Sequence, residues 1–473
     1  MAVFFRLLRG CLILLALISW SGAQDASIRA APKWDCSLQS KDPSRVVWKS
    51  GVGGSYAGAM GMGGGRILVG STDWRPGAGG GGIMTALDSS GRLLWRARHP
   101  GLKDRIHDMG QAIQSQPCFD GKCAYYMSNR GELMCVDVEG FRDGKNDGPF
   151  KGEKWDQGAE DVDIVWKIDL MGELGVFKRE AGDVGNPIPS PIVLGDLVFC
   201  VTAHGVEGVG KRADPKPPSF LAVHKLTGEI AWSSNAPGAN IIYAQWSSPV
   251  CARVKGADQV IFPGGDGFLY GFEPTTGKQL WKLDCHIPGA LDPHKKDFWL
   301  NDKRLDSRFG FVGKPVVHED MLYVALNDSF EFKVPLPLLA IHLPEPGGQP
   351  RIVWKFDDPA FKGTLTSATV EGGLLFVTDA HCTLFALDAK SGREWWRANL
   401  ELDSNNLYAS PVVYRGRVYS GGESTVTVFE AAREKKCVGQ YEFGAAYPGT
   451  PQFADNQMFI AIGEYVYALR LPE

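Results

Sequence analysis

Short apolar runs, each followed by a polar turn and a second run that ends on tryptophan, recur along most of the chain. The clearest copy covers residues 384–396, with an apolar run at 384–387, a turn at 388–392 and a returning run that ends on Trp396. An aspartate at the start of such a turn can accept hydrogen bonds from amides ahead of it, and a glycine at its end supplies positive φ. The pattern therefore predicts two antiparallel strands joined by a tight turn.

The same unit recurs three more times with the tryptophan four residues beyond the turn glycine, and it ends on Trp95, Trp232 and Trp281. Less regular copies extend the set of equivalent positions to residues 48, 95, 166, 232, 281, 354, 396 and 438, where Val438 replaces tryptophan. The spacing is 42 residues in compact copies and up to 73 where a loop is inserted. A repeat of this period is typical of solenoids and propellers.

The two ends of the chain complete each other. Residues 447–471 supply three strands without a tryptophan strand, whereas Val46 to Trp48 is a tryptophan strand with no strand before it. Pairing of residues 46–48 with 465–470 would close a ring and remove exposed sheet edges. The sequence therefore predicts an all-β fold over residues 45–473, an eight-bladed β-propeller of four-stranded antiparallel blades. We expect its tryptophans to lie between adjacent blades, packed on the turn of a neighbour.

The repeat unit resembles the Ala-x-Asp-x-x-Thr-Gly-x-x-x-Trp signature of the quinoprotein-like (PQQ-like) repeat β-propellers over nearly the whole chain. That family contains alcohol and sugar dehydrogenases that hold pyrroloquinoline quinone and calcium in a central funnel. It also contains a non-catalytic, BamB-like branch that serves outer-membrane protein assembly. The segments 137–149, 245–249 and 262–267 are similar to exported propeller-repeat proteins of planctomycete-type bacteria. The resemblance implies the fold and leaves the function open.

The first 23 residues have the pattern of a signal peptide. Arg6 and Arg9 precede an apolar run at 11–20, and Ser21 to Ala23 fit a cleavage site of small residues. About ten apolar residues are too few to span a bilayer comfortably, so we expect cleavage, with retention as an anchor as the alternative. Residues 24–44 are expected to be a polar leader. The protein is then periplasmic or secreted, without a transmembrane segment after cleavage.

The net charge is −4, and near −6 without residues 1–23. This balance argues against a nucleic-acid partner, because such binding depends on cations that neutralise phosphates. One disulfide is expected, between Cys118 and Cys123, if Asp120 and Gly121 form a two-residue hairpin turn that places the cysteines opposite each other. Two reduced thiols are the alternative. Nine cysteines follow the signal peptide, so at least one lacks an intramolecular partner.

Two segments are candidate metal sites. Asp137, Asp143 and Asp147 alternate with glycines, as in a calcium loop, but no closing glutamate follows, and a solvated acidic loop is the favoured interpretation. Cys285, His286 and His294 are zinc-type ligands, but their spacing matches no common pattern and a fourth ligand is not apparent. We expect that loop to cover a face of the ring. The sequence thus assigns no metal, cofactor-binding or catalytic residue.

The blade starts carry a hydroxyl residue before proline, at positions 190, 248, 410 and 450. We expect these residues to pack at the innermost strands, and a ring of hydroxyls that grips a ligand is the alternative. The chain has no adjacent cysteine pair, no Cys-x-x-Cys-His haem site and no Gly-x-Ser-x-Gly elbow. We therefore expect an exported, non-catalytic binding or scaffold protein with protein partners in the cell envelope. The alternatives are a PQQ- and calcium-dependent alcohol or sugar dehydrogenase, and a carbohydrate or peptide binder that uses the channel.

Overall fold

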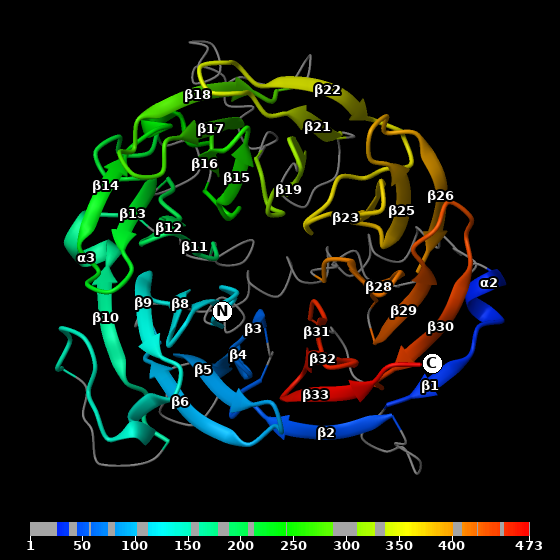
Figure 1. Ribbon diagram of the computed structural model, residues 1–473, viewed down its shortest axis with the longest axis horizontal. Helices are drawn as coiled ribbons and strands as arrows, with labels where there is room; N and C mark the ends of the chain where they lie inside the picture. The colour runs from blue at the N-terminus through cyan, green and yellow to red at the C-terminus, as the bar shows by residue number, and fades with distance from the viewer. Residues whose placement is uncertain are drawn as a thin grey trace, which may run out of the picture.

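Eight antiparallel sheets surround a central axis in the computed structural model (Figure 1). The structure describes residues 26–36, 45–55, 58–73, 81–101, 112–152, 160–177, 189–206, 212–242, 244–286, 310–326, 336–400, 409–422, 424–444 and 449–472. Each blade begins on an inner strand and ends on a strand at the rim. The predicted all-β, eight-bladed propeller is confirmed. The expected signal peptide, residues 1–23, lies outside the described residues.

The blades follow one another in chain order. Blade one contains β3 (Met60–Gly63), β4 (Arg66–Asp73), β5 (Gly81–Asp88) and β6 (Leu93–His99), and blade two contains β7 (Cys118–Asp120), β8 (Cys123–Met127), β9 (Glu132–Asp137) and β10 (Ile164–Asp169). Blade three contains β11 (Ile192–Leu194), β12 (Leu197–Val201), β13 (Phe220–His224) and β14 (Ile230–Ser234), and blade four contains β15 (Val250–Val254), β16 (Ala257–Pro263), β17 (Phe268–Phe272) and β18 (Gln279–Asp284).

Blade five contains β19 (Val316–His318), β20 (Met321–Ala325), β21 (Leu338–His342) and β22 (Arg351–Phe356), and blade six contains β23 (Thr369–Glu371), β24 (Leu374–Thr378), β25 (Thr383–Asp388) and β26 (Glu394–Asn399). Blade seven contains β27 (Val412–Tyr414), β28 (Arg417–Gly421), β29 (Thr425–Glu430) and β30 (Cys437–Glu442). Short helices are α2 (Ala26–Arg29), η2 (Gly140–Asp143), α3 (Leu170–Leu174) and η3 (Gly238–Asn240). Among the described residues, none of these helices is long and apolar enough to cross a membrane.

Blade eight joins the two ends of the chain. Its inner strands are β31 (Gln452–Ala454), β32 (Gln457–Ile462) and β33 (Tyr465–Arg470), and its outer strand is β2 (Val46–Gly51). β2 runs antiparallel to β33, with Trp48 opposite Ala468. The predicted closure of the ring by an N-terminal strand is therefore confirmed. Contacts between residues more than 400 positions apart hold the ring together.

The repeat tryptophans lie between blades, as predicted. Trp95 is fully buried and donates its indole N–H to the carbonyl of Val138, 2.9 Å away in the next blade. Trp396 donates in the same way to Ala432 at 2.8 Å. Trp281 is the exception: it is buried against blade five, but its N–H donates to Gln259 of its own blade at 2.7 Å.

Blade seven corrects the prediction that Val438 is the tryptophan equivalent. Most outer strands have a bulge one residue before the tryptophan, and in blade six Ala386 consequently pairs with Trp396. In blade seven the bulge falls on Val438, and Gly439 takes the pairing position. The ring of Trp34 lies where a side chain at Gly439 would project, 2.6 Å from an ideal Cβ. The leader thus supplies the indole that the blade lacks.

The leader also adds a strand to the ring. β1 (Lys33–Asp35) pairs in parallel with β30, so blade seven has five strands. Ile28, in the preceding helix, is fully buried against blades six and seven, and Cys36 is fully buried against blades seven and eight. The residues that the sequence indicated as a polar leader therefore cover an outer sheet edge. The few apolar residues of the leader are isolated among polar ones. The leader therefore shows no strand or helix periodicity from which this role could be predicted.

Candidate binding groove and axial channel

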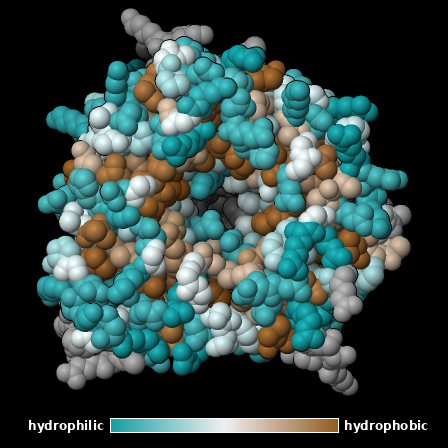
Figure 2. Space-filling model, viewed as in Figure 1, coloured by the Kyte–Doolittle hydropathy of each residue, from teal (hydrophilic) through white to brown (hydrophobic). Residues whose placement is uncertain are grey.

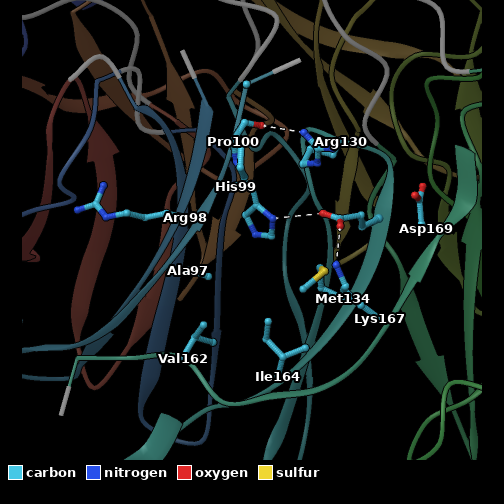
Figure 3. Close-up of a pocket in the computed structure, with 12 residues that line it drawn as sticks. Ala97, Arg98, His99, Pro100, Arg130, Met134, Val162, Ile164, Lys167 and Asp169 are labelled. Atoms are coloured by element: carbon cyan, nitrogen blue, oxygen red, sulfur yellow. Dashed lines mark hydrogen bonds and ion pairs between the residues drawn. The ribbon is translucent and has the colours of Figure 1, made fainter. Parts of the chain in front are cut away.

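A groove of about 700 Å³ lies between the outer parts of blades one and two (Figure 3). Its floor is apolar and comprises Ala97, Met134, Val162 and Ile164. Its polar wall comprises Arg98, His99, Arg130, Glu132, Lys167 and Asp169. The outer strands β6 and β10 and the neighbouring β9 supply most of these residues. Glu132 and Met134 are two positions apart on β9 and therefore project from the same side of the sheet, so a charged group lies beside the apolar floor.

Glu132 is the centre of the polar wall. Lys167 Nζ lies 3.0 Å from Oε1, His99 Nδ1 lies 3.4 Å from Oε2, and Ser128 Oγ donates to Oε2 at 3.0 Å. Burial of the carboxyl opposes its ionisation, but the hydrogen bonds and charges of His99 and Lys167 outweigh that effect. The pKa of Glu132 consequently falls to about 2, and its charge is present throughout the physiological range.

Tyr126 extends this network into the core. Its hydroxyl lies 3.0 Å from His99 Nε2, and its side chain is fully buried. Burial, followed by the negative charge of Glu132, raises the pKa of Tyr126, so the phenol stays protonated beside His99. The other ring nitrogen of His99, Nδ1, faces Glu132. No ligand in the groove can reach Tyr126, so this chain of side chains positions the wall and supplies no exposed nucleophile.

Sequence reasoning did not find this site. Glu132 and Lys167 lie on the paired strands β9 and β10 of blade two, whereas His99 lies on β6 of blade one and reaches them only through the packing of one blade on the next. Lys167 follows the repeat residue Trp166, but a basic residue follows the tryptophan in several blades. No local pattern therefore distinguishes the groove.

The hydroxyl residues at the blade starts link neighbouring blades around the axis. Each accepts a backbone N–H from the preceding blade: Gln116 to Ser190 (2.8 Å), Ser190 to Ser248 (2.8 Å), Ser367 to Ser410 (3.0 Å) and Ser410 to Thr450 (2.9 Å). The expected packing role at the innermost strands is thus observed. Figure 2 shows a hollow at the centre of the ring.

Lys314 interrupts this series at the start of blade five. An ammonium group cannot accept the N–H of Ser248, and Ser247 Oγ instead donates to Gly313 O at 2.8 Å. Burial lowers the pKa of Lys314. Burial raises the pKa of Cys118 and Cys251 to about 12, and the charge of Lys314 opposes that rise. Because these thiols belong to blades two and four, the ammonium extends from blade five towards the axis.

The predicted disulfide is wrong. In the β7–β8 hairpin Cys123 pairs with Asp120, and Cys118 pairs with Tyr125. The two-residue loop is Gly121-Lys122, one position later than predicted, with Gly121 at φ 60°. Cys118 and Cys123 are therefore diagonal neighbours, which lie too far apart for a disulfide. All nine cysteines in the described part of the chain are free thiols.

The candidate metal residues are not gathered into a metal site. Asp137 and Asp143 each accept an N–H two residues ahead, at 2.7 and 2.9 Å, so their carboxylates stabilise turns. Cys285 is buried, His286 Nδ1 lies 2.6 Å from Asp284 Oδ1, and His294 lies outside the described residues. Within the described ranges, no three His, Cys, Asp or Glu side chains are grouped to hold an ion.

The axial residues also do not fit pyrroloquinoline quinone with calcium. Calcium requires several oxygen ligands, among them carboxylates. The described residues at the blade starts are Gln116, Ser190, Ser248, Lys314, Ser367, Ser410 and Thr450, none of which carries a carboxylate. Four of their hydroxyls already accept hydrogen bonds from a neighbouring blade. No redox step is therefore derived from this part of the channel.

Comparisons with known proteins place the fold among propellers. The ring is similar to BamB from Moraxella catarrhalis, with a TM-score of 0.54 and 12% identity over 90% of this chain and 98% of that one. It is also similar to Chaetomium thermophilum Sqt1 bound to the N-terminus of ribosomal protein L10, with a TM-score of 0.56 and 9% identity over 89% and 99% of the two chains. At these identities the likeness concerns the fold alone.

Sequence comparison agrees with the repeat. A 68-residue segment is 35% identical to quinoprotein ethanol dehydrogenase of Pseudomonas putida, and it spans 14% of this chain and 11% of that enzyme. The chain therefore matches about a tenth of the length of this curated relative. A family model described as outer membrane protein assembly factor BamB matches residues 156–288 and 346–436. Together with the eight-bladed ring and its tryptophan repeat, these matches support a place for the chain among the PQQ-like repeat β-propellers.

Proposed function

We propose that this protein is exported and acts as a non-catalytic binding or scaffold protein in the cell envelope, through a protein partner. The hydrogen-bonded links at the blade starts carry the proposal, because side chains that would face a cofactor in an enzyme instead join one blade to the next. The likeness to BamB over 98% of that chain supports it. The signal-like pattern of residues 1–23 supports export.

The rim of blades three to five offers a surface for such a partner. Ile230, Leu280 and Val353 lie on the outer strands β14, β18 and β22, and they are 43%, 38% and 39% exposed. Leu280 and Val353 directly precede the repeat tryptophan, and the side chains at that position in blades one and two, Leu94 and Val165, are buried. The pairing of β1 with β30 shows that the outer edge of a blade can accept a further strand. Strand addition at an exposed edge is a common way to bind an extended segment of a partner.

A pull-down from native envelope, with the tagged protein as bait, tests the proposal. We expect a defined protein partner to be retained and to be lost when Leu280 and Val353 are both changed to Glu. Gln279→Glu adds charge to the same outer strand without removing an apolar side chain and should leave retention unchanged. Equal retention by all three proteins would contradict a role for this rim, and the absence of a partner would contradict the scaffold function.

The alternative is a quinone-dependent dehydrogenase, which the match to the ethanol dehydrogenase favours. An absorbance scan of the purified protein with pyrroloquinoline quinone and calcium, followed by a dye-linked assay with alcohols and sugars, separates the two functions. Stoichiometric uptake of the quinone with turnover would replace the scaffold proposal. A spectrum equal to the sum of its components, without turnover, is the expected result.

A further inference from the structure

In the groove between blades one and two, carboxylate oxygens already accept hydrogen bonds or pair with cations of the protein. Both oxygens of Glu132 are engaged, one by Lys167 and the other by Ser128 and His99. Asp169 Oδ1 caps α3, where it accepts the N–H groups of Met171 at 3.1 Å and of Gly172 at 2.9 Å. Both oxygens of Glu132 and Oδ1 of Asp169 therefore serve the protein itself.

The donors of the same wall are only partly used. The guanidinium of Arg130 presents five N–H groups, and its one hydrogen bond among the described residues runs from Nη1 to the carbonyl of Pro100, at 3.4 Å. The ammonium of Lys167 presents three, and one of them reaches Glu132. Arg98, the third cation of the wall, pairs with Asp73 at 3.1 Å. Within the described part of the chain, Arg130 and Lys167 are thus the cations of the groove with donors left for a ligand. A ligand that complements them must bring acceptors and negative charge.

The floor of the groove adds an apolar requirement. Met134 is buried, and Val162 and Ile164 are half-buried, so their exposed faces present hydrocarbon to the groove. A volume of about 700 Å³ is within the range that holds small organic molecules. Figure 3 shows Val162 and Ile164 below His99 and Lys167, and Arg130 above them. A ligand with an anionic end and an apolar body matches this division.

We propose that the groove binds an organic carboxylate with an apolar body, either a free acid or the C-terminus of a peptide. The carboxylate is held by Arg130, which can bind it in a bidentate manner, and Lys167 adds positive charge to the same wall. The apolar body packs on Met134, Val162 and Ile164. This site is separate from the rim of blades three to five and does not depend on the proposed scaffold function.

Calorimetric titration of the purified full-length protein tests the inference. The probes are hexanoate, 4-phenylbutyrate, and N-acetyl-Leu-Phe with a free or an amidated C-terminus. We expect wild type to bind at least one carboxylate probe, and Arg130→Gln to weaken that binding about tenfold or more because a charged donor is lost. Arg92→Gln removes an exposed arginine from a turn of blade one, outside the groove, and should bind as wild type does.

Two further comparisons complete the test. Val162→Glu should also weaken binding, since it places a carboxylate on the floor, and circular dichroism checks that both groove variants are folded. Tighter binding of the acetylated dipeptide than of hexanoate and 4-phenylbutyrate, lost on amidation, identifies a peptide C-terminus, whereas the reverse order identifies a free acid. Absence of binding by wild type to all four probes at millimolar concentration, equal binding by Arg130→Gln, or equal binding of the amidated dipeptide would overturn the proposal.

Discussion

The indole of Trp232 lies directly against the turn glycine of the next blade, Gly277. A Cβ at Gly277 would be 2.5 Å from ring atom Cδ2, and the indole N–H donates to Pro274 of the same turn at 2.7 Å. Corresponding pairs are Trp48 with Gly91, Trp166 with Gly228, and Trp354 with Gly392. In each of these pairs, the turn glycine of one blade contacts the tryptophan of the blade before it.

Replacement of Gly277 by alanine should destabilise the ring for two reasons. The residue has φ 69°, which costs an L-residue about 1–2 kcal/mol, and the new methyl group would displace Trp232. Gly256→Ala is the matched control, because Gly256 has φ 83° but nothing within 4 Å of its Cβ. Urea unfolding should show a larger loss for Gly277→Ala than for Gly256→Ala. Equal losses would mean that the indole contact contributes nothing.

Trp34 and Gly439 should be energetically coupled. Gly439→Ala places a methyl group 2.6 Å from the Trp34 ring and should be destabilising. Trp34→Ala should itself cost about 1–3 kcal/mol, since it leaves a cavity between blades seven and eight. In the double variant the methyl group has room, so the combined loss should be smaller than the sum of the two single losses. A double-mutant cycle of unfolding free energies measures this coupling, and additive losses would contradict it.

The sequence predicts the ring and its closure because both depend on patterns that the chain repeats. Trp48 lies in a tryptophan strand with no blade before it, and the strand 465–470 ends a blade that lacks its tryptophan strand. The bulge that places Gly439 at the tryptophan position depends on pairing geometry, which a single strand does not reveal. The hairpin near Cys118 illustrates the same limit, because the turn glycine takes the first loop position and shifts the pairing by one residue.

The groove was unpredictable for a different reason. Its central pair, His99 and Glu132, belongs to two blades, and each residue has an ordinary place in its own strand. Lys167 pairs with Glu132 from the adjacent strand of the same blade, and contact between the blades adds His99. A site that a single pair of blades builds leaves no trace in the repeat, whereas a contact that recurs between successive blades, such as that of Trp232 with Gly277, belongs to the repeated pattern.

Replacement of Lys314 by serine should stabilise the protein. The change removes a partly desolvated cation and restores the hydroxyl found at Ser190, Ser248 and Ser410, so Ser248 N–H gains an acceptor. A net hydrogen bond contributes about 0.5–1.5 kcal/mol. Ser190→Ala, which removes such a link, should destabilise by a similar amount. Thermal and urea unfolding measure both changes, and a Lys314→Ser variant no more stable than wild type would show that the lysine fills the channel without cost.

Glu132 should make stability depend on pH in acid. Its pKa in the folded protein is about 2, against an ordinary value of 4.5. The folded state therefore binds this proton less readily than the unfolded chain, and the stabilisation is complete above pH 4.5 and lost as the pH falls towards 2. A shift of this size corresponds to about 3 kcal/mol. Glu132→Gln keeps the shape of the side chain but removes the titration. The difference in unfolding free energy between wild type and Glu132→Gln should be largest at pH 7 and shrink between pH 4.5 and pH 2. A difference that stays constant over that interval would mean that His99 and Lys167 do not stabilise the carboxylate.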